Sequence, residues 1–68
     1  MFMLVVTKIE GKEKTTKTIG TFEDVTECIR RMINLAEINM LENMHGIKYW
    51  IYVIEPVTET VIRKMYIE

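Results

Sequence analysis

Hydrophobic and polar positions divide the chain into five segments with two different periods. Residues 2–9 are rich in Val, Leu and other apolar side chains, and residues 14–20 form a Thr-rich run that contains Ile19. A short polar segment with Gly11 joins the two runs. Such runs on either side of a glycine-containing turn are typical of a β-hairpin. We therefore expect an N-terminal hairpin, with the alternative that the Thr-rich run is a loop.

Residues 22–45 carry the period of an amphipathic helix. The apolar stripe recurs at spacings of three and four residues and consists of Val25, Cys28, Ile29, Met32, Ile33 and Ala36. Thr21, followed by Glu23 and Asp24, matches a helix start in which the threonine oxygen accepts hydrogen bonds from first-turn amides. Gly46 can adopt the left-handed conformation that ends helices. The pattern predicts one long helix packed on a sheet.

A second hairpin is predicted after the helix. Residues 47–54 are a dense apolar and aromatic run, residues 60–67 alternate apolar side chains with Arg63 and Lys64, and Pro56 lies between them. The result is a single α+β domain of ββαββ type, with the helix on one face of a mostly antiparallel sheet. If the Thr-rich run is a loop, the fold is βαββ with three strands. The ββαββ order resembles the β-grasp arrangement, as in the immunoglobulin-binding domains of protein G, in element order alone, so no function follows from it.

One predicted strand is apolar on both faces, whereas a single helix covers only one. Alternation along this strand places two sets of side chains on opposite sides: Ile47, Tyr49, Ile51 and Val53 on one, and Lys48, Trp50, Tyr52 and Ile54 on the other. The last strand divides into Val61, Met65 and Ile67 against Ile62, Lys64 and Tyr66. With the aliphatic sets under the helix, the outer face carries Trp50, Tyr52, Ile62 and Tyr66. Tyr and Trp concentrate binding energy at interfaces, so we expect this face to contact a partner. The alternative is that register shifts return these side chains to the rim of the core.

The predicted helix is longer than the predicted strands. Residues 22–45 would span about 36 Å, against about 27 Å for an eight-residue strand. Ile38 and Leu41 fall away from the apolar stripe, so the last third of the helix is apolar nearly all round. A second copy of the chain would cover this surface, and we therefore expect a homodimer. The alternative is a break near Asn39 that folds residues 40–44 back onto the core.

Composition limits the chemistry of the chain. Its 68 residues suffice for one domain; Cys28 and His45 are the only cysteine and histidine, and serine is absent. An internal disulfide, an ordinary Cys/His zinc site and a Ser-His-Asp triad are thereby excluded. Cys28 and His45 lie more than four turns apart on the predicted helix, so they cannot act as a catalytic pair. We expect no enzyme activity, cofactor or bound metal, and we expect Cys28 to be a small core residue.

The formal net charge of −1 indicates no particular partner and makes nucleic-acid binding less favoured. The apolar N-terminal run is too short for a signal sequence or a membrane span, so we expect a cytoplasmic protein without membrane contact. The leading hypothesis is a self-associating protein-binding or regulatory module, of the kind with which mobile elements inhibit host proteins. A second hypothesis is single-stranded nucleic-acid binding, with Trp50, Tyr52 and Tyr66 stacking on bases and Lys48, Lys64, Lys8 or Lys17 at phosphates. A structural subunit of a larger assembly is the third.

Overall fold

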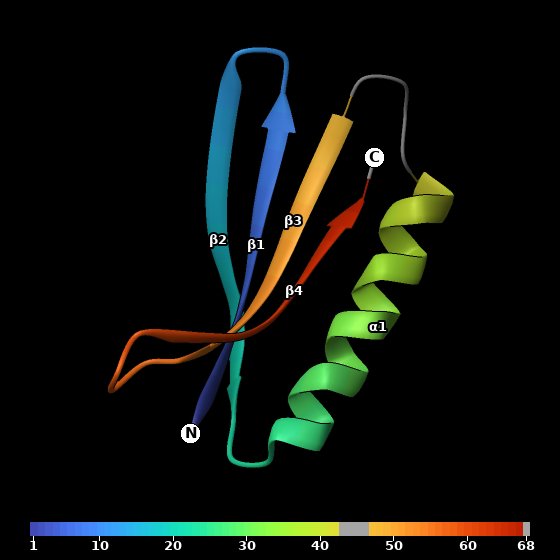
Figure 1. The fold of residues 1–68 in the computed structure, drawn as a ribbon. Coiled ribbons are helices and arrows are strands. Elements are labelled where there is room, and N and C mark those ends of the chain that lie inside the picture. The colour runs from blue at the N-terminus through green and yellow to red at the C-terminus, as the bar shows by residue number, and fades with distance from the viewer. Residues whose placement is uncertain (43–46, 68) are drawn as a thin grey trace.

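One helix lies across one face of a four-stranded sheet (Figure 1). The computed structural model describes residues 1–42 and 47–67, with residues 39–42 described by their backbone alone. The elements are β1 (Phe2–Glu10), β2 (Glu13–Phe22), α1 (Val25–Glu42), β3 (Ile47–Glu55) and β4 (Thr60–Ile67). Their order in the sheet is β2-β1-β3-β4, and every neighbouring pair is antiparallel. The predicted ββαββ order is confirmed.

The Thr-rich run forms an edge strand, so the three-stranded alternative is wrong. Threonine is β-branched and favours extended backbone, and β2 pairs with β1 from Glu13 to Phe22, with Ile19 as one extra residue at a register shift. The hydroxyls of Thr7 and Thr16, which face each other across the pair, are 3.0 Å apart and hydrogen-bonded. Gly11 begins the β1–β2 turn with a φ of 63°, the conformation that a tight hairpin requires at its first central position.

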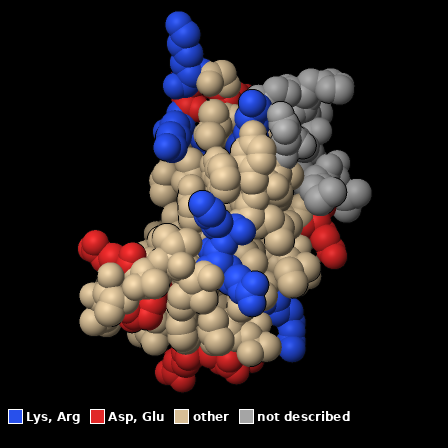
Figure 2. Space-filling view, in the orientation of Figure 1, with Lys and Arg blue, Asp and Glu red and all other residues tan. Residues whose placement is uncertain are grey.

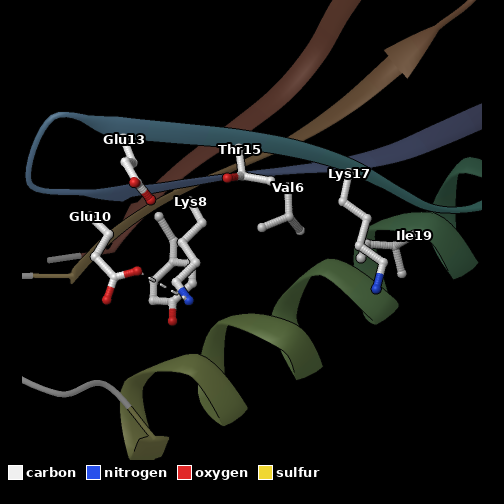
Figure 3. Close-up of a pocket in the computed structure, with 8 residues that line it drawn as sticks. Val6, Lys8, Glu10, Glu13, Thr15, Lys17 and Ile19 are labelled. Carbon is white, nitrogen blue, oxygen red and sulfur yellow. Dashed lines mark ion pairs between the residues drawn. The ribbon is translucent and has the colours of Figure 1, made fainter.

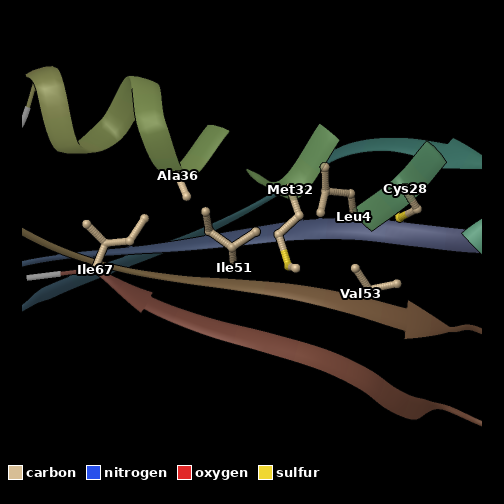
Figure 4. Packing of buried hydrophobic residues seen from close by; sticks show 7 residues of the cluster. All are labelled: Leu4, Cys28, Met32, Ala36, Ile51, Val53 and Ile67. Atoms are coloured by element: carbon tan, nitrogen blue, oxygen red, sulfur yellow. The ribbon is translucent and has the colours of Figure 1, made fainter. Parts of the chain in front are cut away.

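The core lies between α1 and the two central strands, β1 and β3 (Figure 4). The side chains at its centre are Leu4, Cys28, Met32, Ala36, Ile51, Val53 and Ile67. The prediction that Cys28 is a small core residue is therefore confirmed. The predicted helix stripe needs one correction, because Ile33 is 46% exposed, and Leu35 packs against the core in its place. Ile33 falls just outside the buried arc that the four-residue spacing of Cys28, Met32 and Ala36 defines.

The helix begins one turn later than the sequence predicted. Asp24, rather than Thr21, is the capping residue: its Oδ1 accepts a hydrogen bond of 2.8 Å from the Thr26 amide, and its carbonyl accepts one from the Cys28 amide. Thr21 instead pairs with Met3 in the sheet. The 18 residues of α1 span about 27 Å, close to the length of the strands, so the predicted overhang is wrong for the described part of the helix. The predicted break near Asn39 is also wrong, because α1 runs without interruption to Glu42. The predicted helix end at Gly46 lies outside the described residues.

An irregularity in the β3–β4 pairing alters which residues of β4 face the helix. Val53 pairs with Arg63 but Ile54 pairs with Val61, so Ile62 is an extra residue, as in a β-bulge. Because directly paired residues share a face, Val61 lies with Ile54 on the side away from α1, and its predicted place beside Met65 and Ile67 is wrong. Met65 and Ile67 face the helix as predicted.

The β3–β4 connection is ordered by one carboxylate. Glu55 accepts hydrogen bonds from the Thr58 hydroxyl at 2.6 Å, from the Thr58 amide at 2.8 Å and from the Val57 amide at 3.2 Å. These hydrogen bonds, the Thr58 hydroxyl above all, lower the pKa of Glu55 from its ordinary value. The negatively charged carboxylate of Glu55 is therefore engaged in hydrogen bonds within the turn. Within the residues that the structure describes, no helix combines the length and hydrophobicity needed to cross a membrane.

Candidate interaction site

The sheet face opposite α1, here called the outer face, is not covered by any helix or strand of the described residues (Figure 1). Strand pairing defines which side chains share it: Val5 pairs with Tyr52, Thr7 with Trp50, and Trp50 in turn with Tyr66. Lys64 lies opposite Tyr52 on the same face. The predicted division of β3, with its aromatic set away from the helix, is thus confirmed.

Three aromatic rings form a contiguous cluster on this face. The ring centroids of Trp50 and Tyr66 are 4.7 Å apart with planes inclined by 40°, and those of Trp50 and Tyr52 are 6.1 Å apart with nearly parallel planes. The ammonium of Lys64 lies 5.6 Å from the centre of the Trp50 ring, within the range of a cation–π interaction. These contacts join the three rings and the ammonium into one cluster. We call Trp50, Tyr52 and Tyr66, together with the neighbouring Val61 and Ile62, the aromatic patch.

Part of the aromatic patch serves the fold itself. Val5 and Thr7 are only 6% and 4% exposed although they lie on the face without a helix, because they are directly opposite Tyr52 and Trp50. Trp50 and Tyr52 are accordingly half-buried. The outer members of the patch remain open to solvent, with Tyr66, Ile62 and Val61 between 39% and 49% exposed. The exposed apolar surface of the patch is therefore concentrated at the β4 side of the outer face.

A shallow hollow of about 400 Å³ accompanies the bulge in β4. Its lining residues are Tyr52, Val61, Ile62, Arg63 and Lys64. A bulge bends its strand and turns side chains away from the regular alternation, which explains how neighbouring residues of β4 line one hollow. The hollow has an aromatic and aliphatic lining and two cationic side chains, and it is continuous with the aromatic patch.

Charge is distributed unevenly over the molecule. Lys and Arg side chains gather over the middle of β4, whereas acidic side chains gather at the β3–β4 turn and below, where β2 leads into α1 (Figure 2). Pairing places Lys14, Lys48 and Lys64 on the outer face, and no acidic residue of the four strands as described shares it. The acidic strand residues Glu10 and Glu13 pair with each other on the opposite face.

A second cavity, of about 280 Å³, opens on the helix side of the sheet near the β1–β2 turn (Figure 3). Its lining includes Lys8, Lys17 and Tyr49, and Lys8 forms an exposed ion pair of 3.8 Å with Glu10. The two lysines are therefore on the wrong face to meet phosphates of a strand stacked on Trp50, which corrects that part of the nucleic-acid hypothesis. An exposed ion pair of this kind contributes little to stability or specificity.

The structure brings together most of the predicted partner-binding residues, namely Trp50, Tyr52, Ile62, Lys64 and Tyr66. Ile38 does not join them: it is 43% exposed on α1, which covers the other face of the sheet. The side chain of Leu41 lies outside the described residues. Sequence reasoning missed Val61, which the bulge brings to the outer face, and Arg63, which lines the hollow although it pairs with Val53 on the helix face. No signal in the sequence marks where a bulge falls.

Groups capable of catalysis do not converge in the described part of the chain. Cys28 is fully buried, and burial raises the pKa of its thiol, which disfavours the reactive thiolate. His45 lies outside the described residues. Among those described, no three His, Cys, Asp or Glu side chains are grouped so that they could hold a metal ion. The exposed aromatic patch is thus the most developed candidate site.

Comparison of the chain with protein-family models, with curated proteins and with solved structures gives no match. The functional argument therefore depends on the geometry of the outer face.

Proposed function

We propose that this protein is a non-enzymatic protein-binding module that uses the aromatic patch of its outer face. The observation that carries the proposal is an ordered cluster of aromatic rings, open at Tyr66 and bordered by exposed Val61 and Ile62, on a sheet face without a covering layer. Burying such side chains against a complementary surface supplies the binding free energy of most hot spots. A regulatory role, such as inhibition of the partner, belongs to the same proposal, because a module of this size acts by occupying a surface.

Ring geometry favours a protein over single-stranded nucleic acid as the partner. A base-stacking platform offers the open face of an aromatic ring to each base. In this cluster Tyr66, Tyr52 and the Lys64 ammonium all lie close to the Trp50 ring, so part of the ring surface is already in contact within the protein. Lys8 and Lys17 also point away from the cluster, and the net charge is −1. The most exposed parts of the patch are Tyr66 and the aliphatic Val61 and Ile62, which suit contacts with protein side chains.

Site-specific photocross-linking in the cells that naturally contain the protein tests the proposal. A benzoylphenylalanine introduced at Tyr66 should cross-link to a different protein. The same group at Thr26, an exposed position at the start of α1 on the other side of the sheet, should not. Adding Ile62→Ser to the Tyr66 cross-linking variant should remove the product while leaving the circular dichroism spectrum unchanged, because Ile62 contributes little to the core.

Three results would count against the proposal. A product that nuclease digests would show a nucleic-acid partner. Equal cross-linking from Thr26 and Tyr66 would show collision rather than binding. A product that contains only second copies of the chain would assign the patch to self-association.

A further inference from the structure

We infer that the partner surface is acidic around an apolar anchor: an aliphatic or aromatic side chain enters the hollow beside the β4 bulge, and flanking carboxylates pair with Arg63 and Lys64. This inference rests on the proposed function and specifies the chemistry of the partner. The hollow of about 400 Å³ is lined by apolar atoms of Tyr52, Val61 and Ile62, and both cations belong to the same lining.

The charged residues that line the hollow, Arg63 and Lys64, are both positive and both exposed. Lys64 shares the outer face with Tyr52, whereas Arg63, on the edge strand, pairs with Val53 on the helix face and still belongs to the lining of the hollow. The charged outer-face residues of the described strands are lysines. The carboxylates nearest to the lining along the chain are those of Glu59 and Glu55; neither residue lines the hollow, and the carboxylate of Glu55 is engaged with the Thr58 hydroxyl and amide in the turn. A complementary partner therefore presents negative charge beside its apolar contact, since oppositely charged surfaces attract and like charges are rejected.

Arginine and lysine at this place would contribute differently. The guanidinium of Arg63 has a planar donor fork that can bind both oxygens of one carboxylate. Lys64 is restrained over the Trp50 ring, so its ammonium reaches a partner carboxylate with little further loss of side-chain freedom. Together they can fix the direction of an acidic segment across β4, while the apolar anchor supplies most of the contact area.

A second copy of the chain and a single-stranded nucleic acid fit this surface less well than an acidic protein segment. A second copy placed face to face would bring the Lys64 side chains of both copies into one apolar interface, where like charges are costly. A single nucleic-acid strand matches the charge but finds the Trp50 ring partly occupied by Tyr66, Tyr52 and Lys64. An acidic protein segment satisfies both the charge and the ring arrangement.

Nuclear magnetic resonance titration of the isotope-labelled full chain tests this inference. The probe is a short synthetic peptide that alternates Glu with Leu, with a Lys-for-Glu version and an oligothymidylate of equal negative charge as controls. The acidic peptide should shift the Trp50 indole signal and the amides of Ile62 and Lys64, and the shifts should weaken at high salt. The basic peptide and the oligothymidylate should leave them unchanged.

A matched pair of variants locates the charge effect. The double variant Arg63→Ala, Lys64→Ala should weaken peptide binding about tenfold at low salt and by much less at high salt. The control Arg30→Ala, Arg31→Ala removes the same charge from exposed positions on α1 and should have no effect. If the first double variant unfolds, Arg63→Gln alone, which leaves the Lys64–Trp50 contact in place, should weaken binding by a smaller factor.

The inference is overturned if the acidic peptide produces no shifts at millimolar concentration, if the oligothymidylate binds as tightly, or if both double variants weaken binding equally. Cross-linking from Tyr66 to a partner together with any of these results would leave the proposed function in place and refute only the acidic chemistry. Absence of the Tyr66 cross-link would refute the proposed function itself.

Discussion

Two residues in the described chain adopt a left-handed backbone conformation, Gly11 with φ of 63° and Glu59 with φ of 58°. Glycine adopts this conformation without steric cost, whereas a residue with a Cβ does not. Glu59 ends the β3–β4 connection that Glu55 and Thr58 organise, so the turn imposes the conformation on it. Two positions with nearly the same φ thus carry glycine, which suits this conformation best, and glutamate, which adopts it at a steric cost.

We expect Glu59→Gly to stabilise the protein by about 0.5–1 kcal/mol, because it removes the steric strain of the left-handed conformation. The midpoint of urea unfolding should rise without a change in its slope. Glu59→Ala removes the same carboxylate but keeps the Cβ, so it should give no comparable gain. Equal stabilisation by both variants would attribute the effect to the charge and refute the argument from backbone strain.

Gly11 provides the reverse control for this prediction. A Cβ built at Gly11 meets no atom within 4 Å, so Gly11→Ala adds conformational strain without a steric contact elsewhere. It should destabilise the protein by about 1 kcal/mol. A neutral effect at Gly11 would indicate that the turns relax at little cost and would remove the basis for the Glu59 prediction as well.

At the scale of elements, the start of α1 shows how sheet pairing decides between two sequence signals. Both Thr21 and Asp24 are good capping residues, and the sequence alone favoured Thr21. In the structure Phe2 pairs with Phe22 and Met3 with Thr21, so β2 continues past Thr21 and leaves Asp24 to cap the helix. A long-range pairing therefore overrides a local preference.

We expect Asp24→Ala to destabilise the protein by about 1 kcal/mol, because the Thr26 amide loses its hydrogen-bond acceptor and the helix dipole loses a favourable charge. The matched variant Thr21→Ala should change stability by less than about 0.5 kcal/mol, since its side chain lies exposed in the strand. Thermal or urea unfolding of both variants measures the difference. A larger loss at Thr21 than at Asp24 would contradict the assigned helix start.

The difference between local sequence signals and long-range strand pairing also explains how much of the site could be predicted. Alternation in the third predicted strand correctly separated Trp50 and Tyr52 from Ile51 and Val53, because the period of a strand is local. The place of the bulge could not be predicted, since it depends on how β4 pairs with β3, and for that reason Val61 was missed. Strand order was beyond reach for the same reason: it is a property of contacts between segments far apart in the sequence.

At the scale of the whole molecule, a net charge near zero conceals a division between faces. The strands place their described outer-face charges as lysines, while acidic residues lie at the turns and around the start of α1. The net charge of the chain therefore gives no support to an electrostatic hypothesis, although the charged strand residues described on the outer face are all positive. The charge of each sheet face can be assigned only after strand pairing has shown which residues share that face, and the net charge of the chain does not contain this information.

This division also bears on self-association, which stays a prediction. The outer face is unsuited to self-pairing because of Lys64, whereas α1 exposes Ile38 and Ile33 on the opposite side of the molecule. We therefore expect a homodimer to form through α1, which leaves the aromatic patch of each copy open to its partner. Sedimentation equilibrium should show Ile38→Glu weakening the dimer by at least about tenfold, because a carboxylate placed in an apolar contact is costly to desolvate.

Ile62→Glu is the matched control for Ile38→Glu, because Ile62 is 39% exposed and Ile38 is 43% exposed. It introduces the same charge on the outer face and should leave the dimer intact. A dimer abolished by Ile62→Glu alone would mean that two copies meet through the aromatic patch despite their lysines, and a chain that is monomeric at high micromolar concentration would mean that Ile38 is only an isolated surface residue. The first of these results would also argue against the acidic partner, since a patch that is occupied by a second copy cannot at the same time bind that partner.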